Sequence, residues 1–160
     1  SAEKSGSDFI VRKMEIIFVC HGNICRSPMA EFVMKKILAD RGVSGVTVLS
    51  RALHTDALGC NVYYPARKVL EAHGVPYERR SARLMTQREY DEADLVVVMD
   101  EENYADAVRA FGGKKVIKLL SAAGESGDVA DPWYTGDFER TYADVYRGCS
   151  ALAGATARRP

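Results

Sequence analysis

Short apolar runs alternate along the chain with longer segments in which apolar residues recur every three or four positions. The short runs are rich in Val, Ile and Leu, which is typical of strands buried on both faces of a parallel sheet. They occupy residues 16–19, 46–49, 95–99 and 116–120. The longer segments have the periodicity of amphipathic helices and occupy residues 28–41, 62–73, 101–111 and 138–152, with a shorter helix indicated at 86–90.

This alternation predicts an α/β fold, a doubly wound three-layer sandwich in which helices cover both faces of a parallel sheet. Ligands of such folds bind beyond the carboxyl ends of the strands, and Cys20 lies at that end of the first strand. We expect one domain over residues 14–160, because Met14 directly precedes the first strand. The polar residues 1–13 are expected to form a flexible tail, native or left over from expression.

The segment between the first strand and the first helix carries the candidate chemistry. It reads Cys-His-Gly-Asn-Ile-Cys-Arg-Ser from Cys20 to Ser27. A loop this short must curl, so that its backbone N–H groups converge on one point, and the N-terminus of the following helix adds positive potential there. The guanidinium of Arg26 matches two oxygens of a phosphate, and Cys20 is placed beneath the anion as a nucleophile in its thiolate form.

Each remaining residue of this loop has an expected place in an anion site. Gly22 allows positive φ or a close approach of the ligand, and Asn23 tolerates the left-handed conformation and can brace the loop. Ser27 is predicted to cap the helix, with Pro28 at its first position. His21 is expected at the loop surface rather than as a base. The predicted phosphate-binding set comprises His21, Gly22, Asn23, Ile24, Cys25 and Ser27.

The residues from Val19 to Pro28 closely resemble the signature of the low-molecular-weight protein tyrosine phosphatases. A second match lies at 131–134, where Asp-Pro and two aromatic residues resemble the segment that supplies the general acid of that family. Residues 94–100 resemble the third strand of the family and its end, so the resemblance covers about residues 14–153. It implies a four-stranded sheet and a metal-free phosphatase that forms a cysteinyl-phosphate.

The resemblance and the residue types together assign the steps of the reaction. Cys20 attacks phosphorus while Arg26 and the loop amides hold the phosphate oxygens. Ser27 donates a hydrogen bond to the thiolate, as its counterpart does in the family. Asp131 protonates the departing phenolate and then activates water against the cysteinyl-phosphate. Pro132 restricts Asp131 to an extended backbone, which helps to aim its side chain.

Trp133 and Tyr134 stand beside this acid and have two possible roles. They either pack into the core or form a wall against which a tyrosine ring stacks. A cysteine at the bottom of an aromatic-walled slot reaches a phosphotyrosine but not the shorter phosphoserine, so the second role predicts tyrosine selectivity.

Three further positions are expected to support the site. Ser50 ends the second strand, where the family places a serine that hydrogen-bonds the loop asparagine, but Arg-Ala-Leu follows here, and the adjoining loop at 54–65 receives no assignment. Arg80 is available where the family often has a histidine that buttresses the asparagine, so this buttress is expected to differ. Asp100 either braces the phosphate loop or caps the helix that starts at Glu101.

Cys25 lies inside the same loop as Cys20, and two roles are open for it. It either fills space or acts as a redox guard that forms a disulfide with oxidised Cys20, and the family resemblance favours the guard. Cys60 and Cys149 have no such neighbour in the sequence. The cysteines do not form the paired framework of a secreted scaffold, so we expect a reducing, cytoplasmic setting.

Composition and missing motifs exclude several classes of partner. The chain has 22 basic and 22 acidic residues, without a basic stripe or an apolar stretch of membrane-spanning length, so neither nucleic acid nor a membrane is expected as a partner. No Gly-Lys-Ser/Thr follows the loop, and no His/Cys spacing typical of a metal site lies near it. We therefore expect no cofactor and no metal, and a monomer that acts on phosphotyrosine-containing proteins.

Three alternatives remain beside the tyrosine phosphatase. A protein arginine phosphatase has the same scaffold, but those enzymes tend to carry threonine at the position of Ile24 and lack the aromatic pair after Asp-Pro. An arsenate reductase needs relay cysteines near residues 80–90, where this sequence has none. A non-catalytic phosphate-binding module needs neither Cys20 nor Asp131.

Overall fold

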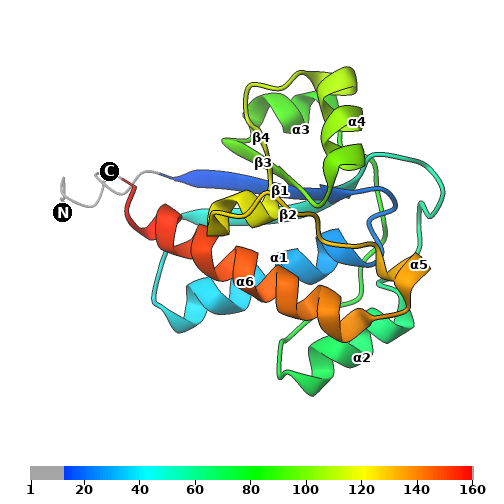
Figure 1. Cartoon of the computed structure of the whole chain (residues 1–160). Coiled ribbons are helices and arrows are strands. Elements are labelled where there is room, and N and C mark those ends of the chain that lie inside the picture. The colour runs from blue at the N-terminus through cyan, green and yellow to red at the C-terminus, as the bar shows by residue number, and fades with distance from the viewer. Residues whose placement is uncertain (1–12, 160) are drawn as a thin grey trace.

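The computed structural model describes residues 13–159, so nearly all of the predicted tail lies outside the described part. Its centre is a parallel sheet with the strand order β2-β1-β3-β4 (Figure 1), which confirms the predicted four-stranded architecture. The strands are β1 (Met14–Cys20), β2 (Val46–Ala52), β3 (Leu95–Val98) and β4 (Val116–Lys118). Four consecutive residues of β1, from Ile16 to Val19, are fully buried, as expected for a strand covered on both faces.

Helices form a layer on each face of the sheet (Figure 1). One layer contains α1 (Arg26–Asp40), α2 (Tyr64–Ala72) and α6 (Phe138–Ala157), and the other contains α3 (Gln87–Glu92) and α4 (Glu101–Phe111). Alternate residues of β1 feed the two cores, because Phe18 packs with the first layer and Ile17 with the second. Within the described residues, no helix is both long enough and apolar enough to cross a membrane.

The parallel register brings three strand ends together at one edge of the sheet. Cys20 pairs with Ala52 of β2, and Val19 pairs with Val98 of β3. The residues that follow these strands therefore start near Cys20, at the edge where the fold predicts a ligand. One more short helix, α5 (Pro132–Thr135), begins immediately after Asp131.

The structure corrects several predicted boundaries. The fourth strand ends at Lys118 instead of residue 120, and the 3₁₀ helix η2 (Leu119–Ala123) follows it. Its two leucines nevertheless stay buried. The last helix runs beyond residue 152 to Ala157, because Ala153 and Thr156 continue its buried face. The remaining helix ends differ from the prediction by no more than two residues.

Candidate active site

Several carbonyl groups of the loop between β1 and α1 accept hydrogen bonds from residues outside the loop. The N–H groups of Leu53 and His54 donate to the carbonyl oxygens of Cys20 and His21, each at 3.0 Å. Both donors follow β2, so the strand register places them beside the loop.

Two later carbonyl groups of the loop are held in the same way. The N–H of Tyr63 donates to the carbonyl oxygen of Ile24 at 2.8 Å, and Nη1 of Arg80 donates to that of Asn23 at 2.8 Å. The C=O and N–H groups of a trans peptide point in opposite directions, so these bonds turn loop N–H groups toward the inside of the curl. Segment 54–65, which has no assignment in the sequence, thus contributes two of these donors.

The sulfur of Cys20 receives donors from this curl. The N–H groups of Asn23 and Ser27 lie 3.3 and 3.4 Å from it, and Oγ of Ser27 lies at 3.1 Å. The side chain of Cys20 is almost fully buried, with 3% of the residue exposed. Two backbone N–H groups therefore point at one buried sulfur atom.

Ser27 is not the helix cap that its sequence position predicts. The helix begins at Arg26, two residues before the predicted start at Pro28, and no side chain caps it. The hydroxyl oxygen of Ser27 instead accepts from Nδ2 of Asn23 at 2.8 Å and lies 3.1 Å from the sulfur of Cys20. The serine side chain therefore lies beside the sulfur of Cys20 rather than capping the helix.

Asn23, rather than Gly22, adopts the left-handed backbone of the loop, with φ of 62°. Its side chain is fully buried and donates from Nδ2 to Oγ of Ser50 at 3.1 Å as well as to Ser27. Its Oδ1 accepts from Nη2 of Arg80. Ser50 and Arg80 thus lie where the sequence places the support of the asparagine.

Arg26 brings a positive charge to the pocket, and its side chain is only 3% exposed. Nη1 donates to Oδ2 of Asp100 at 2.7 Å and to the carbonyl of Val129 at 2.8 Å, while Nη2 lies 3.4 Å from Oδ2 of Asp131. Burial alone would lower the pKa of Arg26. The negative charges of Cys20, Asp100 and Asp131 outweigh burial and raise it, so the guanidinium stays charged.

Asp100 performs both functions that the sequence left open. Its Oδ2 braces Arg26, and its Oδ1 accepts from the N–H of Asn103 at 2.7 Å, which caps α4. One carboxylate therefore fixes both the start of a helix and the direction of the Arg26 guanidinium.

Asp131 reaches the same space from a distant part of the chain. Its backbone is extended, with φ of −76° and ψ of 114°, as expected for a residue before proline. Its Oδ1 accepts from the N–H of Trp133 at 3.0 Å, and its side chain is 25% exposed. The carboxyl group is therefore oriented by its own helix and still open to the pocket.

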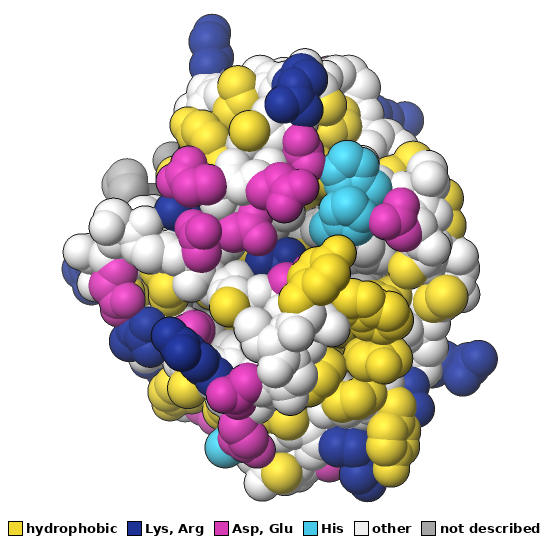
Figure 2. Space-filling model, turned by 45° about the vertical axis from the view of Figure 1, so that its right-hand side comes forward, with side chains coloured by type: hydrophobic (Ala, Val, Ile, Leu, Met, Phe, Trp, Pro, Cys, Tyr) yellow, Lys and Arg dark blue, Asp and Glu magenta, His cyan; other side chains and the backbone are white. Residues whose placement is uncertain are grey.

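A pocket of about 350 Å³ contains these groups. Its lining combines the loop with carboxylates and the aromatic pair, namely Cys20, His21, Gly22, Ile24, Cys25, Arg26, Asp56, Ala57, Asp100, Glu102, Asn103, Asp131, Trp133 and Tyr134. Trp133 is 56% and Tyr134 84% exposed, which excludes the core-packing role for both. Hydrophobic side chains adjoin acidic and histidine side chains on the face turned forward in Figure 2.

Three polar lining residues were not expected from the sequence. Asp56, Glu102 and Asn103 enter the pocket because the loop after β2 and the start of α4 meet at its mouth. His21 lies at the surface, as predicted, where its Nε2 is 2.6 Å from Oδ2 of Asp56 and its ring stacks on His54 with centroids 4.2 Å apart. No local sequence signal marks these neighbours.

Cys25 lies in the same pocket and is 5% exposed. Burial raises the pKa of its thiol, the negative charges of Cys20 and Asp131 raise it further, and Arg26 opposes them. These effects favour the protonated thiol at Cys25, and neither Cys25 nor Cys20 is in a disulfide.

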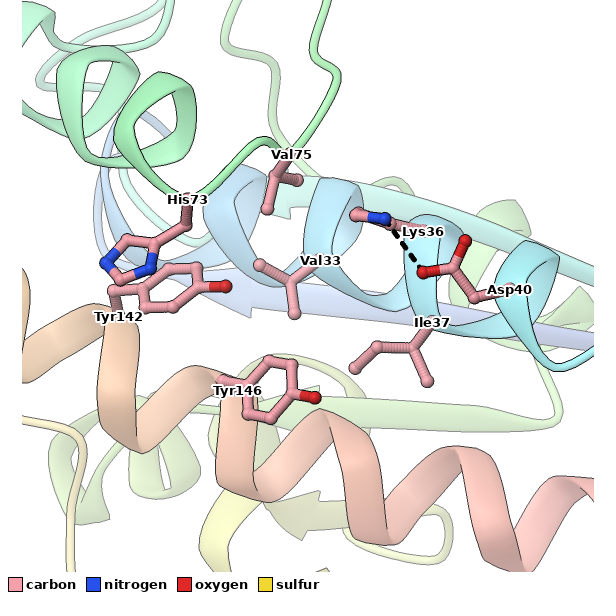
Figure 3. Close-up of a pocket in the computed structure, with 8 residues that line it drawn as sticks. All are labelled: Val33, Lys36, Ile37, Asp40, His73, Val75, Tyr142 and Tyr146. Atoms are coloured by element: carbon pink, nitrogen blue, oxygen red, sulfur yellow. Dashed lines mark hydrogen bonds and ion pairs between the residues drawn. The ribbon is translucent and has the colours of Figure 1, made fainter.

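A second pocket, of about 390 Å³, lies between α1 and α6 (Figure 3). Lys36 and Asp40 on its edge pair with each other at 2.8 Å, and Tyr142 stacks on His73 with ring centroids 3.9 Å apart. It shares no lining residue with the first pocket and contains neither a cysteine nor an arginine. The predicted reacting residues therefore line the first pocket and not the second.

Comparisons with known proteins agree with this geometry. Residues 15–159 match the family model described as low molecular weight phosphotyrosine protein phosphatase. A curated relative, the low molecular weight protein-tyrosine-phosphatase PtpA of Staphylococcus haemolyticus (strain JCSC1435), is 36% identical over 143 residues, which cover 87% of this chain and 91% of the relative.

Solved structures share the fold over nearly the whole chain. YfkJ from Bacillus subtilis has a TM-score of 0.84 and 29% identity, covering 89% of this chain and 94% of that protein. The YwlE arginine phosphatase, solved as a mutant with a phosphorylated active-site serine, has a TM-score of 0.82 and 27% identity, covering 91% and 97% respectively.

Proposed function

The chain belongs to the low molecular weight phosphotyrosine protein phosphatase family, and on this premise we propose that it hydrolyses phosphotyrosine in proteins through a cysteinyl-phosphate. One observation carries the assignment of the residues. The sulfur of Cys20 accepts N–H donors from its own loop, and it shares one pocket with the buried cation Arg26 and the carboxyl group of Asp131. These are the nucleophile, the anion holder and the acid that the reaction needs.

In the first step the thiolate of Cys20 attacks phosphorus, and the bond to the tyrosine oxygen breaks. Arg26 and the loop N–H groups hold the remaining phosphate oxygens, whose charge they stabilise in the transition state. Asp131 gives its proton to the departing phenolate, which would otherwise leave with a pKa near 10.

In the second step water releases the phosphate. The carboxylate left on Asp131 takes a proton from water, whose oxygen attacks phosphorus while the bond to the sulfur of Cys20 breaks. The products are inorganic phosphate and the regenerated thiolate, with the proton back on Asp131. The same carboxyl group thus serves as acid and then as base.

The aromatic side chains favour phosphotyrosine as the substrate. Trp133 and Tyr134 follow the acid and stand exposed along the pocket, where a tyrosine ring can stack on them. An arginine phosphatase is the second candidate, since YwlE has the same fold, and the carboxylates of Asp56 and Glu102 could face a guanidinium. Ile24 in the pocket and the aromatic pair favour a tyrosine phosphatase over an arginine phosphatase.

The setting of the enzyme is part of the same proposal. We infer one phosphatase domain over residues 14–160 that acts as a cytoplasmic monomer without metal or cofactor. All of the proposed reacting groups that line the pocket come from one chain, which supports the monomer. A thiolate nucleophile stays reduced in a reducing compartment, which supports the cytoplasm.

Cys25 is proposed to protect the nucleophile from irreversible oxidation. Peroxide oxidises Cys20 to a sulfenic acid, the thiol of Cys25 then attacks its sulfur, and water leaves as the disulfide forms. A cellular thiol reduces that disulfide and restores Cys20. The burial of both cysteines in one pocket supports this role.

Peptides of one sequence carrying phosphotyrosine, phosphoserine or phosphoarginine test the proposal directly. Phosphate release from each is measured with the wild-type chain and with Cys20→Ser as the blank. We expect release from phosphotyrosine alone. Faster release from phosphoarginine would replace the tyrosine assignment by the arginine one, and release that persists in Cys20→Ser would refute the cysteinyl-phosphate.

A further inference from the structure

Lys118 is the last residue of β4 and pairs in register with Val98, at the edge of the sheet where the pocket lies. It does not line the pocket itself. We propose that Lys118 is a positioning residue, which ties the segment before Asp131 to the start of α4 and so holds the carboxyl group of Asp131 in place for proton transfer. This inference rests on the proposed phosphatase chemistry, in which Asp131 is the acid.

Three contacts of Lys118 connect the two segments. Its Nζ donates to the backbone carbonyl of Ser126 at 2.8 Å and lies 2.7 Å from Oδ1 of Asp128. Its third partner is Oε2 of Glu101, the first residue of α4, at 2.7 Å. An ammonium group has three donors, and the side chain of Lys118 is only 11% exposed. The lysine therefore links two segments and is not a solvated surface charge.

The segment 125–131, which ends at Asp131, needs such an anchor because it contains neither a helix nor a strand. Only Val129 within it is buried, and its N–H donates to the carbonyl of Met99 at 2.9 Å. Gly127, which has more backbone freedom than any other residue type, lies in the middle of the segment. The two residues that flank this glycine are the ones that Lys118 holds, so the freedom of the glycine is not passed on toward Asp131.

The two segments that Lys118 joins also carry the partners of Arg26. Nη1 of Arg26 donates to Asp100, immediately before α4, at 2.7 Å, and to the carbonyl of Val129 at 2.8 Å. Two residues after Val129, the carboxylate of Asp131 lies 3.4 Å from Nη2 of the same guanidinium. The position of Asp131 beside Arg26 therefore depends on how the two segments are held together.

The charge of Lys118 is part of this link. Burial alone would lower the pKa of its ammonium group, but the bonds to Asp128 and Glu101 outweigh burial and raise it, so the lysine stays charged. Without this cation the carboxylates of Asp128 and Glu101 would repel each other. The segment 125–131 would then move away from α4, and Asp131 would move with it.

The first test compares Lys118→Met with Lys114→Met, which removes the same charge from an exposed position before β4. We expect Lys118→Met to lower kcat/KM for phenyl phosphate by about tenfold, because a small displacement of a reacting group is costly. The loss for p-nitrophenyl phosphate should stay within about threefold, because its leaving group has less need of a proton. Lys114→Met should match the wild type with both substrates. An equal loss for both substrates, or equal values for the two variants, would overturn the proposal.

The second test adds Lys118→Met to a chain that already carries Asp131→Asn. If Lys118 acts through the acid, the added substitution should change kcat/KM for phenyl phosphate by less than about twofold, because no acid is left to misplace. A further tenfold loss would contradict the inference. Asp131→Asn alone examines the proposed function: an equal loss for both leaving groups refutes the acid itself, whereas a loss confined to phenyl phosphate together with a further loss from Lys118→Met refutes only the positioning.

Thermal unfolding of each variant verifies that it is folded. If Lys118→Met does not fold, Asp128→Asn takes its place, because it removes one contact of Lys118 with the segment 125–131 and keeps the bond to Glu101. We then expect a loss of about threefold for phenyl phosphate and none for p-nitrophenyl phosphate. Wild-type values of kcat/KM for both substrates in Asp128→Asn would overturn the proposal.

Discussion

The floor and the rim of the pocket differ in how their side chains are held. The floor consists of Cys20, Asn23, Arg26 and Ser27. The rim consists of Asp56, Glu102, Trp133 and Tyr134. No floor residue is more than 3% exposed, whereas Tyr134 on the rim is 84% exposed. The floor is a closed set of hydrogen bonds, and the rim is a set of side chains open to solvent.

This difference suits the floor to the reaction itself and the rim to the choice of substrate. A transition state needs donors that are already in place, and only buried, fully bonded groups keep such an arrangement. A substrate that arrives as part of another protein needs surface that it can cover, and exposed aromatic rings offer it. Asp131 lies at the border, oriented by the N–H of Trp133 but still 25% exposed, as suits a group that meets both the leaving group and water.

The largest expected effect comes from the centre of the floor. Cys20→Ser should abolish turnover, because a serine hydroxyl at this position has no thiolate to attack with, while phosphate binding persists through Arg26 and the loop amides. Initial rates and phosphate titration by calorimetry measure the two properties. Cys60→Ser, at an exposed cysteine, is the matched control and should keep full activity. Loss of phosphate binding in Cys20→Ser would show that the floor had collapsed rather than lost its nucleophile.

Asp131, which lies between the floor and the rim, should give the next largest effect. Asp131→Asn should slow the hydrolysis of phenyl phosphate by about 10²–10⁴-fold, because the phenolate then leaves without a proton. The loss should be much smaller for an activated leaving group such as p-nitrophenolate. Asp56→Asn, which removes a carboxylate from the rim, is the control and should change both rates little. An equal loss for both leaving groups would remove Asp131 from the acid role.

A rim substitution should act on selection rather than chemistry. Trp133→Ala should lower kcat/KM for a phosphotyrosine peptide by about threefold to tenfold, since an aromatic contact contributes about 0.5–1.5 kcal/mol beyond its area. It should leave the rate for a small alkyl phosphate nearly unchanged. Tyr146→Ala, at an exposed tyrosine of α6, provides the comparison. The same loss for both substrates would mean that Trp133 supports the floor.

The smallest effect on turnover is expected for Cys25→Ser. Its thiol is protonated, since burial raises its pKa, so activity before oxidation should stay within about twofold of the wild type. Recovery after peroxide and then a thiol reductant should fall sharply, because oxidised Cys20 has lost the partner that forms a disulfide. Activity is followed before peroxide and after reduction. Unchanged recovery would leave Cys25 only the role of filling space.

Local patterns in the sequence were sufficient to predict most of the helices and strands and to select candidate reacting residues. Apolar runs identified the buried strands, and the spacing of Cys20 and Arg26 between a strand and a helix indicated an anion site. Such features depend on neighbours a few residues apart, so they can be read along the chain. The same local reasoning was wrong for Ser27, because a serine before Pro28 suits a helix cap and nothing nearby reveals that its hydroxyl faces a sulfur.

The sequence by itself determined the fold class, and it indicated the loop of Cys20 and the carboxyl group of Asp131 as candidate reacting groups, because each is marked by a short run of residue types. Only the tertiary structure decided which groups hold that loop in shape. Arg80 contacts Asn23 across 57 positions, and Arg26 contacts Asp100 across 74. The packing of strands and helices sets such contacts, and no local pattern records which distant side chain will meet a given carbonyl or cation.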